Sequence, residues 1–438
     1  MKLGIYLKES WYNLRKDRVY SAVYIIGTGL SLALVTAWLT VQSMHFDNAY
    51  PETHRDRMLI VGALMESSLD GETNSTAMLS ADFVDRFLKE PIEGVEDVTA
   101  FCFGQVAVSN ESGEGMTAVV EYVDDEFWKV FGFDFVSGRA FSMKDMNRTA
   151  PEAVISESAA RMIFGHADVV GETLFSPEGQ FRICGVVRDA PKTAAYAFSQ
   201  IWAADVNRGE SDASTFAWLG RESMLGDYMA VVLAEDRSRF DSIRAEIEDR
   251  LSRYNSSEGV EYTLSMHMGI PSVKESAFMW TGFTSGTYTW IGIGIMAFVL
   301  LVPMINLSGM VGSRTEARMG EFGVRKSFGA WKSDILGQIT GENLLLTFFG
   351  GLLGLVLSWI LLGAFSEQFN SLVPAETIAL VWAEGDVEGA LFSVRDFFSL
   401  KLYLILLLIV LALNMLSSLL PAMKVIRRPI TESLNYNK

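Results

Sequence analysis

Four long apolar runs constrain this 438-residue chain more than any other feature of its sequence. A helix needs about 20 apolar residues to cross the roughly 30 Å hydrocarbon core of a bilayer, and each run reaches that length. Half of all residues are hydrophobic, which is high for a soluble protein. Four buried core helices of this length would be unusual, so we expect a membrane protein. The runs are Val19–Val41, Tyr288–Met310, Asn343–Phe365 and Leu400–Leu420.

The first run could belong to a cleaved signal peptide, because five basic residues precede it. Its apolar stretch is longer than the roughly 7–15 residues of an ordinary signal peptide, and no clear A-x-A cleavage site follows. We therefore interpret the run as an uncleaved signal anchor, which remains in the membrane as the first span.

The distribution of charge predicts the orientation of the chain. Residues 1–18, 312–341 and 423–438 together contain 14 Lys and Arg against six acidic residues, whereas residues 44–284 contain 20 basic and 40 acidic residues. Because basic loops stay on the cytoplasmic side, both termini are expected in the cytoplasm. The chain is expected to cross a bacterial inner (plasma) membrane several times. The net charge of −17 belongs mainly to the exported region and argues against nucleic acid binding.

The expected fold class is a membrane protein with four transmembrane α-helices in a 1+3 layout and a large α+β extracytoplasmic domain between helices 1 and 2. In that domain, Val98–Asn110 and Phe181–Asp189 are rich in β-branched and aromatic residues, as strands are. Helical spacing of apolar residues marks Ala81–Lys89, Ser156–Phe164 and Arg237–Tyr254. The predicted boundaries are 1–18 for a cytoplasmic amphipathic helix, 19–43 for helix 1, 44–284 for the extracytoplasmic domain, 285–311 for helix 2, 312–341 for a cytoplasmic coupling segment, 342–365 for helix 3, 366–399 for an external loop, 400–422 for helix 4 and 423–438 for a cytoplasmic tail.

Two pairs of small residues suggest specific contacts. Gly350 and Gly354 form a G-x-x-x-G pattern, which lets two membrane helices approach closely, although the pattern alone is a weak signal. Cys102 and Cys184 both lie in the exported region, where they are either a candidate disulfide or two buried thiols.

Several catalytic signatures are absent from the sequence. It contains no G-x-x-x-x-G-K-[ST], so the chain itself is not expected to bind and hydrolyse ATP. It also contains no H-E-x-x-H and no G-x-S-x-G, and its four histidines lack metal-ligand spacing. We therefore expect neither enzymatic activity nor a cofactor or metal in this chain.

The basic segment, residues 312–341, lies between the second and third apolar runs. Its charges alternate, and Phe322 and Val324 are apolar residues among them. This pattern favours a surface that docks a cytoplasmic protein over a helix that only contacts anionic lipid. Glu342 follows at the mouth of the third run, where we interpret it as an interfacial side chain rather than a coupling residue.

Several separated patches resemble the MacB/FtsX-like family of ABC transporter permeases. The basic segment contains RTEARMGEFGVRKSFGAWKSDI (Arg314–Ile335), which is similar to the family's loop after the second span. The sequence LLPAMKVIRRPITESLN (Leu419–Asn435) resembles its closing motif, and VDDEFWKVFGFDFVSGRAFSMKD (Val123–Asp145), AVISESAARMIFGHADVVGETL (Ala153–Leu174) and FRICGVVRDAP (Phe181–Pro191) resemble the MacB-type periplasmic core domain. Two departures stand out: Ala317 and Met319 interrupt the usual run of charges, and the loop after the third span is long.

The resemblance implies a permease that works as a homodimer or heterodimer with a separate cytoplasmic ABC ATPase, which binds the ATP. A periplasmic adaptor or an outer-membrane protein is a further expected partner, and the membrane lipid surrounds the spans. By the same resemblance, motion of the external domain would serve efflux of drugs, peptides or lipid-linked substrates. The residues expected to contact the ATPase are Arg314, Glu316, Glu321, Phe322, Val324, Arg325 and Lys326, with Phe322 and Val324 packing into a groove of the ATPase.

Alternative functions remain open at this point. Within the transporter class, lipoprotein release and FtsX-like control of a cell-wall hydrolase compete with efflux. A transmembrane sensor would combine a ligand-binding exported domain with an inner loop that recruits a signalling protein, but the chain shows no long cytoplasmic coiled coil. A membrane enzyme is less favoured, because no nucleophile–base or metal motif is present.

Overall fold

The computed structural model describes residues 11–12, 15–146, 150–177, 179–206, 223–278, 284–364 and 399–426. They fall into two compact units. The helical unit contains the described residues up to Gln42 and those of 286–364 and 399–426, and the sheet unit contains those of 43–285. The predicted N-terminal helix (1–18), external loop (366–399) and cytoplasmic tail (423–438) lie largely outside the described residues.

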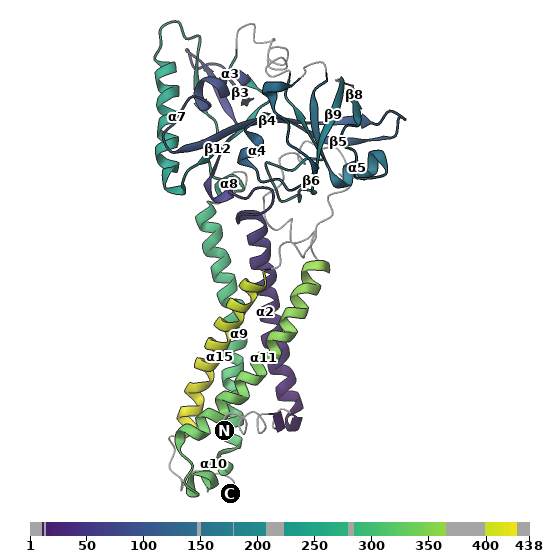
Figure 1. Cartoon of the computed structure of the whole chain (residues 1–438). Helices are drawn as coiled ribbons and strands as arrows, with labels where there is room; N and C mark the ends of the chain where they lie inside the picture. The colour runs from purple at the N-terminus through teal and green to yellow at the C-terminus, as the bar shows by residue number, and fades with distance from the viewer. Residues whose placement is uncertain are drawn as a thin grey trace. The chain divides into compact units, whose positions relative to one another are not determined.

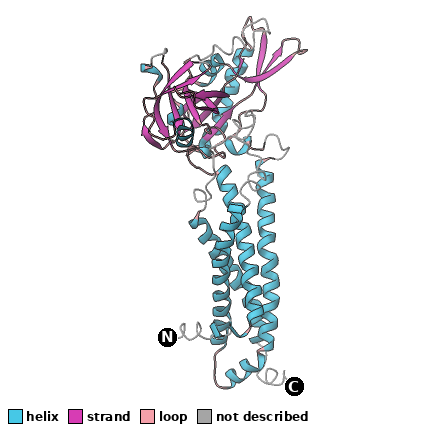
Figure 2. Cartoon of the chain, turned by 90° about the vertical axis from the view of Figure 1, so that its right-hand side faces the viewer, coloured by secondary structure: helices cyan, strands magenta, loops and turns pink. Residues whose placement is uncertain are grey.

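Long apolar helices make up the helical unit and run side by side (Figures 1 and 2). A rise of about 1.5 Å per residue makes a helix of 23 residues about 35 Å long, enough to cross a bilayer. The described residues contain three helices that meet this criterion by length and composition, over Arg18–Thr40, Lys332–Ala364 and Leu400–Leu419. The helices of the unit are α2 (Arg18–Phe46), α9 (Ser285–Ala317), the short α10 (Met319–Ser327), α11 (Lys332–Ala364) and α15 (Leu400–Ile426).

The predicted second span falls within α9, which is one continuous helix of 33 residues. Within the residues whose side chains the structure describes, its continuous apolar stretch covers Ser285–Leu301. The structure therefore supports a membrane protein with three candidate spans, and α9 is a fourth long helix beside them.

Backbone-to-backbone contact joins α2 to α11. A Cβ on Gly354 would lie 2.9 Å from the carbonyl oxygen of Gly29, and a Cβ on Gly350 would lie 2.9 Å from the Cβ of Thr28. These distances are too short for a real side chain, so the glycines allow the two helices to approach. This contact is the kind predicted from the G-x-x-x-G pattern.

Hydrogen bonds between side chains add to this packing inside the bundle. The hydroxyls of Tyr24 on α2 and Thr347 on α11 are 3.2 Å apart, and the amide of Asn414 on α15 donates to the Thr347 oxygen at 3.1 Å. All three residues are buried. Because lipid offers no partners for polar groups, these groups satisfy one another and fix the relative rotation of α2, α11 and α15.

The sheet unit is an α+β domain. One nine-stranded sheet has the order β1-β12-β4-β5-β10-β7-β9-β6, with β8 beside β4 and β9, and a four-stranded sheet has the order β11-β3-β2-β13. The β5–β10 and β7–β9 pairs are parallel, and the other described pairs are antiparallel. The strands are β1 (Met58–Val61), β2 (Leu64–Ser68), β3 (Asn74–Leu79), β4 (Val95–Ser109), β5 (Gly115–Val123), β6 (Phe135–Gly138), β7 (Glu152–Ser156), β8 (Thr173–Ser176), β9 (Gly179–Val187), β10 (Ile201–Ala204), β11 (Leu225–Gly226), β12 (Met229–Ala234) and β13 (Tyr262–Met266).

Local sequence signals explain the helices of this unit. Ser156 caps α5 by accepting a hydrogen bond from the amide of Ala159, and Gly165 ends the helix with a φ of 81°, which only glycine adopts easily. α7 buries Ile243, Ile247 and Leu251, which recur at helical spacing on one face. The helices are α3 (Ala81–Phe83, continued by a π turn at Val84–Leu88), α4 (Phe127–Val130), α5 (Glu157–Phe164), α7 (Phe240–Asn255) and α8 (Val273–Ser276). The strands and helices predicted from the sequence patterns are thereby confirmed.

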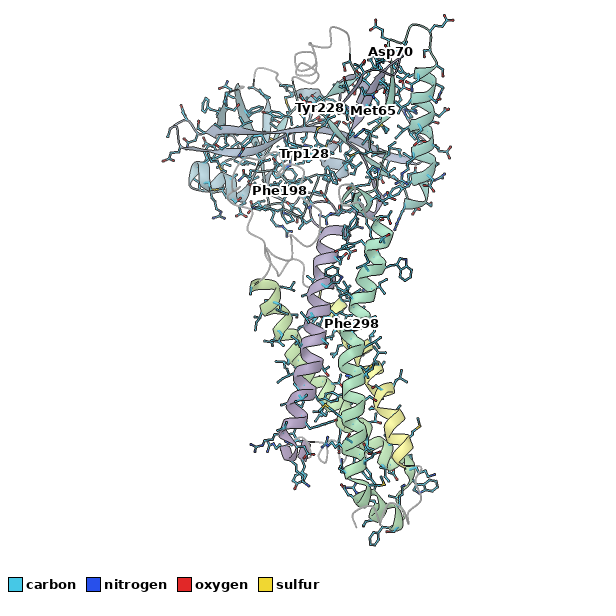
Figure 3. The ribbon with its side chains drawn as sticks, turned by 180° about the vertical axis from the view of Figure 1, so that it is seen from behind. Met65, Asp70, Trp128, Phe198, Tyr228 and Phe298 are labelled. Atoms are coloured by element: carbon cyan, nitrogen blue, oxygen red, sulfur yellow. The ribbon has the colours of Figure 1, made fainter. Side chains whose placement is uncertain are left out.

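An aromatic cluster forms one core of the sheet unit. Phe127 contacts Phe101, Phe131 and Trp128 with ring centroids 4.7 to 6.0 Å apart. Figure 3 labels Trp128 within this unit and Asp70 on the turn between β2 and β3 at its outer edge. Such ring pairs each stabilise a core by about 0.5–1.5 kcal/mol beyond the area that they bury.

The two cysteines are not joined by a disulfide in the structure. Cys184 on β9 is buried, and its Sγ donates to the carbonyl oxygens of Arg139 and Ala153. Burial raises the pKa of the Cys184 thiol to about 12, so the reactive thiolate form is disfavoured at neutral pH. The candidate disulfide between Cys102 and Cys184 is not formed.

The close approach of α2 and α11 predicts that alanine changes the stability of the bundle differently at two glycines of α11. Gly354→Ala should destabilise the bundle by about 1–3 kcal/mol, because the added methyl group meets the backbone of Gly29. Gly363→Ala meets nothing within 4 Å and should be neutral or slightly stabilising. Thermal unfolding in detergent measures both. Equal melting temperatures for the two variants would contradict the packing.

Candidate functional site

The basic segment is more helical than a simple loop. α9 continues to Ala317, Arg318 stands at the cap position of α10, and α11 begins at Lys332. The chain reverses after α10 at Gly329, which has a φ of 88°. Glu321 in the first turn of α10 and Arg325 in its last turn both have the charge that the helix dipole favours.

A buried carboxylate organises the junction of these helices. Glu342 on α11 is 5% exposed and accepts from the Arg318 guanidinium through both carboxylate oxygens, at 3.0 and 3.1 Å. Arg314 on α9 lies 3.4 Å from the same carboxylate. Arg314 also lies 3.2 Å from the carboxylate of Asp17, just before α2. The residues Asp17, Arg314, Arg318 and Glu342 are called the charge cluster below. The Glu342 side chain does not extend outward to water, as the predicted interfacial side chain would, because two arginines compensate its charge inside the unit.

A second set of ion pairs joins α10 to the charge cluster. Glu321 pairs with Arg318 at 3.0 Å and with Arg325 at 2.9 Å, and Arg325 also donates to the side-chain oxygen of Gln338 on α11 at 2.7 Å. Burial alone would raise the pKa of Glu321, but hydrogen bonds and charge from Arg318 hold it below the usual value. Burial would likewise lower the pKa of Arg318, but Glu321 and Glu342 keep it raised. These groups therefore remain charged at neutral pH, and α10 is held against both long helices.

Phe322 does not face outward, contrary to its predicted role in a partner's groove. Its side chain is 2% exposed and packs in a hydrophobic cluster with Tyr24, Val311, Ile335 and Ile339. The reason is the amphipathic character of α10, which buries Met319, Phe322 and Gly323 on one face. Phe322 is an internal anchor of α10.

Other apolar side chains of the basic segment are exposed instead. Phe328 is 87% exposed and Trp331 is 77% exposed, on either side of the turn at Gly329, and Val324 on α10 is 47% exposed. We call these three residues the apolar tip. Sequence reasoning identified Val324 but missed the two aromatic residues, although FGAW is an aromatic-rich turn in an otherwise charged segment.

The remaining predicted residues are Glu316 on α9 and Arg325 and Lys326 on α10. Glu316 and Lys326 are half-buried, and Arg325 is partly exposed. Burial, and then the charge of Lys332, lowers the pKa of Lys326. The structure thus brings Arg314, Glu321 and Arg325 into one ion-pair network that also contains Arg318 and Glu342, two residues outside the predicted set.

Within the residues that the structure describes, no group of three or more His, Cys, Asp or Glu side chains is placed to hold a metal ion. The site presents ion-paired side chains beside three exposed apolar residues, Val324, Phe328 and Trp331. Long apolar helices with a separate α+β unit define the chain as a membrane protein.

Comparison with known families agrees with this class. Residues 21–250 match the MacB-like periplasmic core domain, and residues 293–430 match the FtsX-like permease C-terminal domain. The chain belongs to the MacB/FtsX-like family of ABC transporter permeases.

Individual relatives are distant. The macrolide export ATP-binding/permease protein MacB of Shewanella sp. (strain ANA-3) is 24% identical over 68% of this chain and 44% of its own length. MacB of Escherichia coli (strain K12) is 27% identical over 56% of this chain and 35% of its own length. The crystal structure of the periplasmic region of MacB from Actinobacillus actinomycetemcomitans matches 48% of this chain and 88% of that structure, with 15% identity and a TM-score of 0.32. The chain thus spans less than half the length of these curated relatives.

Neutralising the buried carboxylate should loosen α10. In Glu342→Gln, Arg318 and Arg314 lose the carboxylate that they share. This loss should lower the stability of the helical unit by about 3 kcal/mol. Glu321→Gln, at a side chain 42% exposed, should cost less than about 1 kcal/mol. Hydrogen exchange of the backbone amides of residues 319–327 measures how much each variant loosens α10. Equal protection of α10 in the two variants would show that Glu342 does not hold the junction.

Proposed function

We propose that this chain is the permease subunit of an ABC transporter, which couples ATP hydrolysis by a separate cytoplasmic ATPase to movement of its extracytoplasmic domain. The observation that carries the proposal is an exposed apolar tip on a short helix that is braced to two long helices. Phe328 and Trp331 are exposed at 87% and 77%, while Arg318 ties the base of α10 to Glu342. A partner that binds the tip can therefore move α9 and α11 together.

The proposed topology has four spans, with α9 as the second span and both termini in the cytoplasm. Support comes from the basic character of residues 1–18, 312–341 and 423–438 against the acidic character of residues 44–284. The boundaries predicted from the sequence are retained as part of this proposal. α9 contributes 33 continuous helical residues, long enough to cross a bilayer.

The proposed contact with the ATPase has two parts. The apolar tip would supply buried anchors, since large aromatic side chains contribute most of the binding energy at protein interfaces. Glu321, Arg325 and Lys326 would form a charged rim that sets orientation. In this proposal the ATP is bound by the partner.

The substrate is proposed as a class only. Relatives are named macrolide export proteins, which favours efflux of drugs, peptides or lipid-linked molecules over control of a cell-wall hydrolase. We further propose that two copies of this chain, or this chain and a similar permease, assemble around a pair of ATPase subunits, with an adaptor outside the membrane.

Removing the aromatic anchors should release the ATPase without unfolding the permease. Phe328→Ala with Trp331→Ala should weaken binding at least tenfold, because each exposed ring is lost from the interface. The measurement is recovery of an ATPase when the full chain is purified from its native host in mild detergent. The proposal fails if the same ATPase is recovered with the double variant, or if none is recovered with the unchanged chain.

Phe348→Ala with Trp359→Ala is the matched control. Both side chains are exposed, at 48% and 43%, and both lie on α11 outside the basic segment. This variant should retain the ATPase.

A further inference from the structure

A cleft of about 910 Å³ opens between the start of α2 and the last turns of α9. This volume lies within the roughly 300–1,000 Å³ of typical ligand sites. None of the residues of the apolar tip lines the cleft. Among the lining residues, Lys16, Arg18 and Arg314 are basic and Asp17 is acidic. Both walls belong to the helical unit.

The cleft retains positive charge after its internal pairing. Arg314 approaches Asp17 at 3.2 Å, so these two charges compensate each other, and the Arg314 guanidinium also lies 4.6 Å from the centre of the Tyr20 ring. Lys16 and Arg18 are exposed, and in the described part of the chain neither forms an ion pair, apart from a longer-range attraction of Lys16 to Glu321. Two cations at the cleft are therefore left to attract an anion.

An apolar stripe continues from this cleft along α2. Val19 lines the cleft and is 79% exposed, and Val23, Ile26 and Leu30 follow it with exposures of 47% to 56%. Their spacing of four, three and four residues places them on one face of the helix. Met310 adds an apolar side chain from α9. One bound phospholipid would contact both the cleft and this stripe, whereas an inorganic anion or a nucleotide would contact the cleft alone.

We propose that the cleft binds the head group of an anionic phospholipid, with the phosphate held by Lys16 and Arg18 and one acyl chain lying along Val19, Val23, Ile26 and Leu30. Basic pockets between membrane helices are suited to such head groups. The placement in the cytoplasmic leaflet rests on the proposed topology. A lipid bound there contacts α2 and α9 at the level of the charge cluster, so it would stabilise the junction that holds α10.

The test is lipid retention by the full chain in nanodiscs that contain equal amounts of phosphatidylglycerol and phosphatidylcholine, read by native mass spectrometry. The unchanged chain should retain phosphatidylglycerol in preference to phosphatidylcholine. Lys16→Gln with Arg18→Gln should lower that preference ten- to thirty-fold, since each basic residue near a membrane surface contributes about fivefold. Lys332→Gln with Lys401→Gln removes two exposed lysines away from the cleft and should leave the preference unchanged.

Three results would overturn the proposal. One is equal retention of the two lipids by the unchanged chain. Another is displacement of phosphatidylglycerol by millimolar inorganic phosphate, which would make the site one for a free anion. The third is efficient cross-linking of Val19→Cys between two copies in native membranes, which would show that a second copy covers the stripe. The nanodiscs contain no ATPase, so lipid retention can fail while ATPase recovery succeeds, or the reverse. They also present the same lipid on both sides, so the result does not depend on the proposed orientation.

Discussion

The pairing of Glu342 with Arg318 and Arg314 is the interaction on which the helical unit depends. A carboxylate that is 5% exposed is costly to bury unless its charge is compensated, and two guanidinium groups within 3.4 Å compensate it here. Those two arginines come from the end of α9 and from the cap of α10, while Glu342 comes from α11. One carboxylate thereby fixes the junction of three helices.

This arrangement gives the basic segment two faces with different tasks. The inner face buries Phe322 among Tyr24, Val311, Ile335 and Ile339, so α10 cannot rotate or detach without exposing a packed cluster. The outer side presents Phe328 and Trp331 at a turn. Under the proposed function this short helix would act as a lever, because force on its outer side would reach the long helices through packed contacts.

The fold could be predicted largely from the sequence, because its signals are local. The apolar runs predicted the long helices, and the β-branched stretches predicted β4 and β9. The small residues Gly350 and Gly354 suggested a close helix contact, but their partners Thr28 and Gly29 on α2 appear only in the structure. The predicted second span, Tyr288–Met310, lies inside the continuous helix α9.

The candidate site was harder to predict, because its side-chain directions depend on tertiary packing. A helix of nine residues contains too few turns for periodicity to decide whether Phe322 or Val324 faces inward. The burial of Glu342 depends on Arg314 and Arg318, which lie 28 and 24 residues earlier in the chain, and no local pattern links them. Exposure of Trp331 likewise depends on the reversal at Gly329, whose consequence appears only once α11 is placed.

A double-mutant cycle between Arg318 and Glu342 tests the central claim most directly. Arg318→Leu, Glu342→Leu and the combined variant would be compared with the unchanged chain by the free energy of unfolding in detergent. The account predicts that each single variant is strongly destabilised, by about 3 kcal/mol, while the double variant recovers much of the loss because no buried charge is left alone. Additive losses, with a coupling energy near zero, would contradict the claim that this pair holds the helices together.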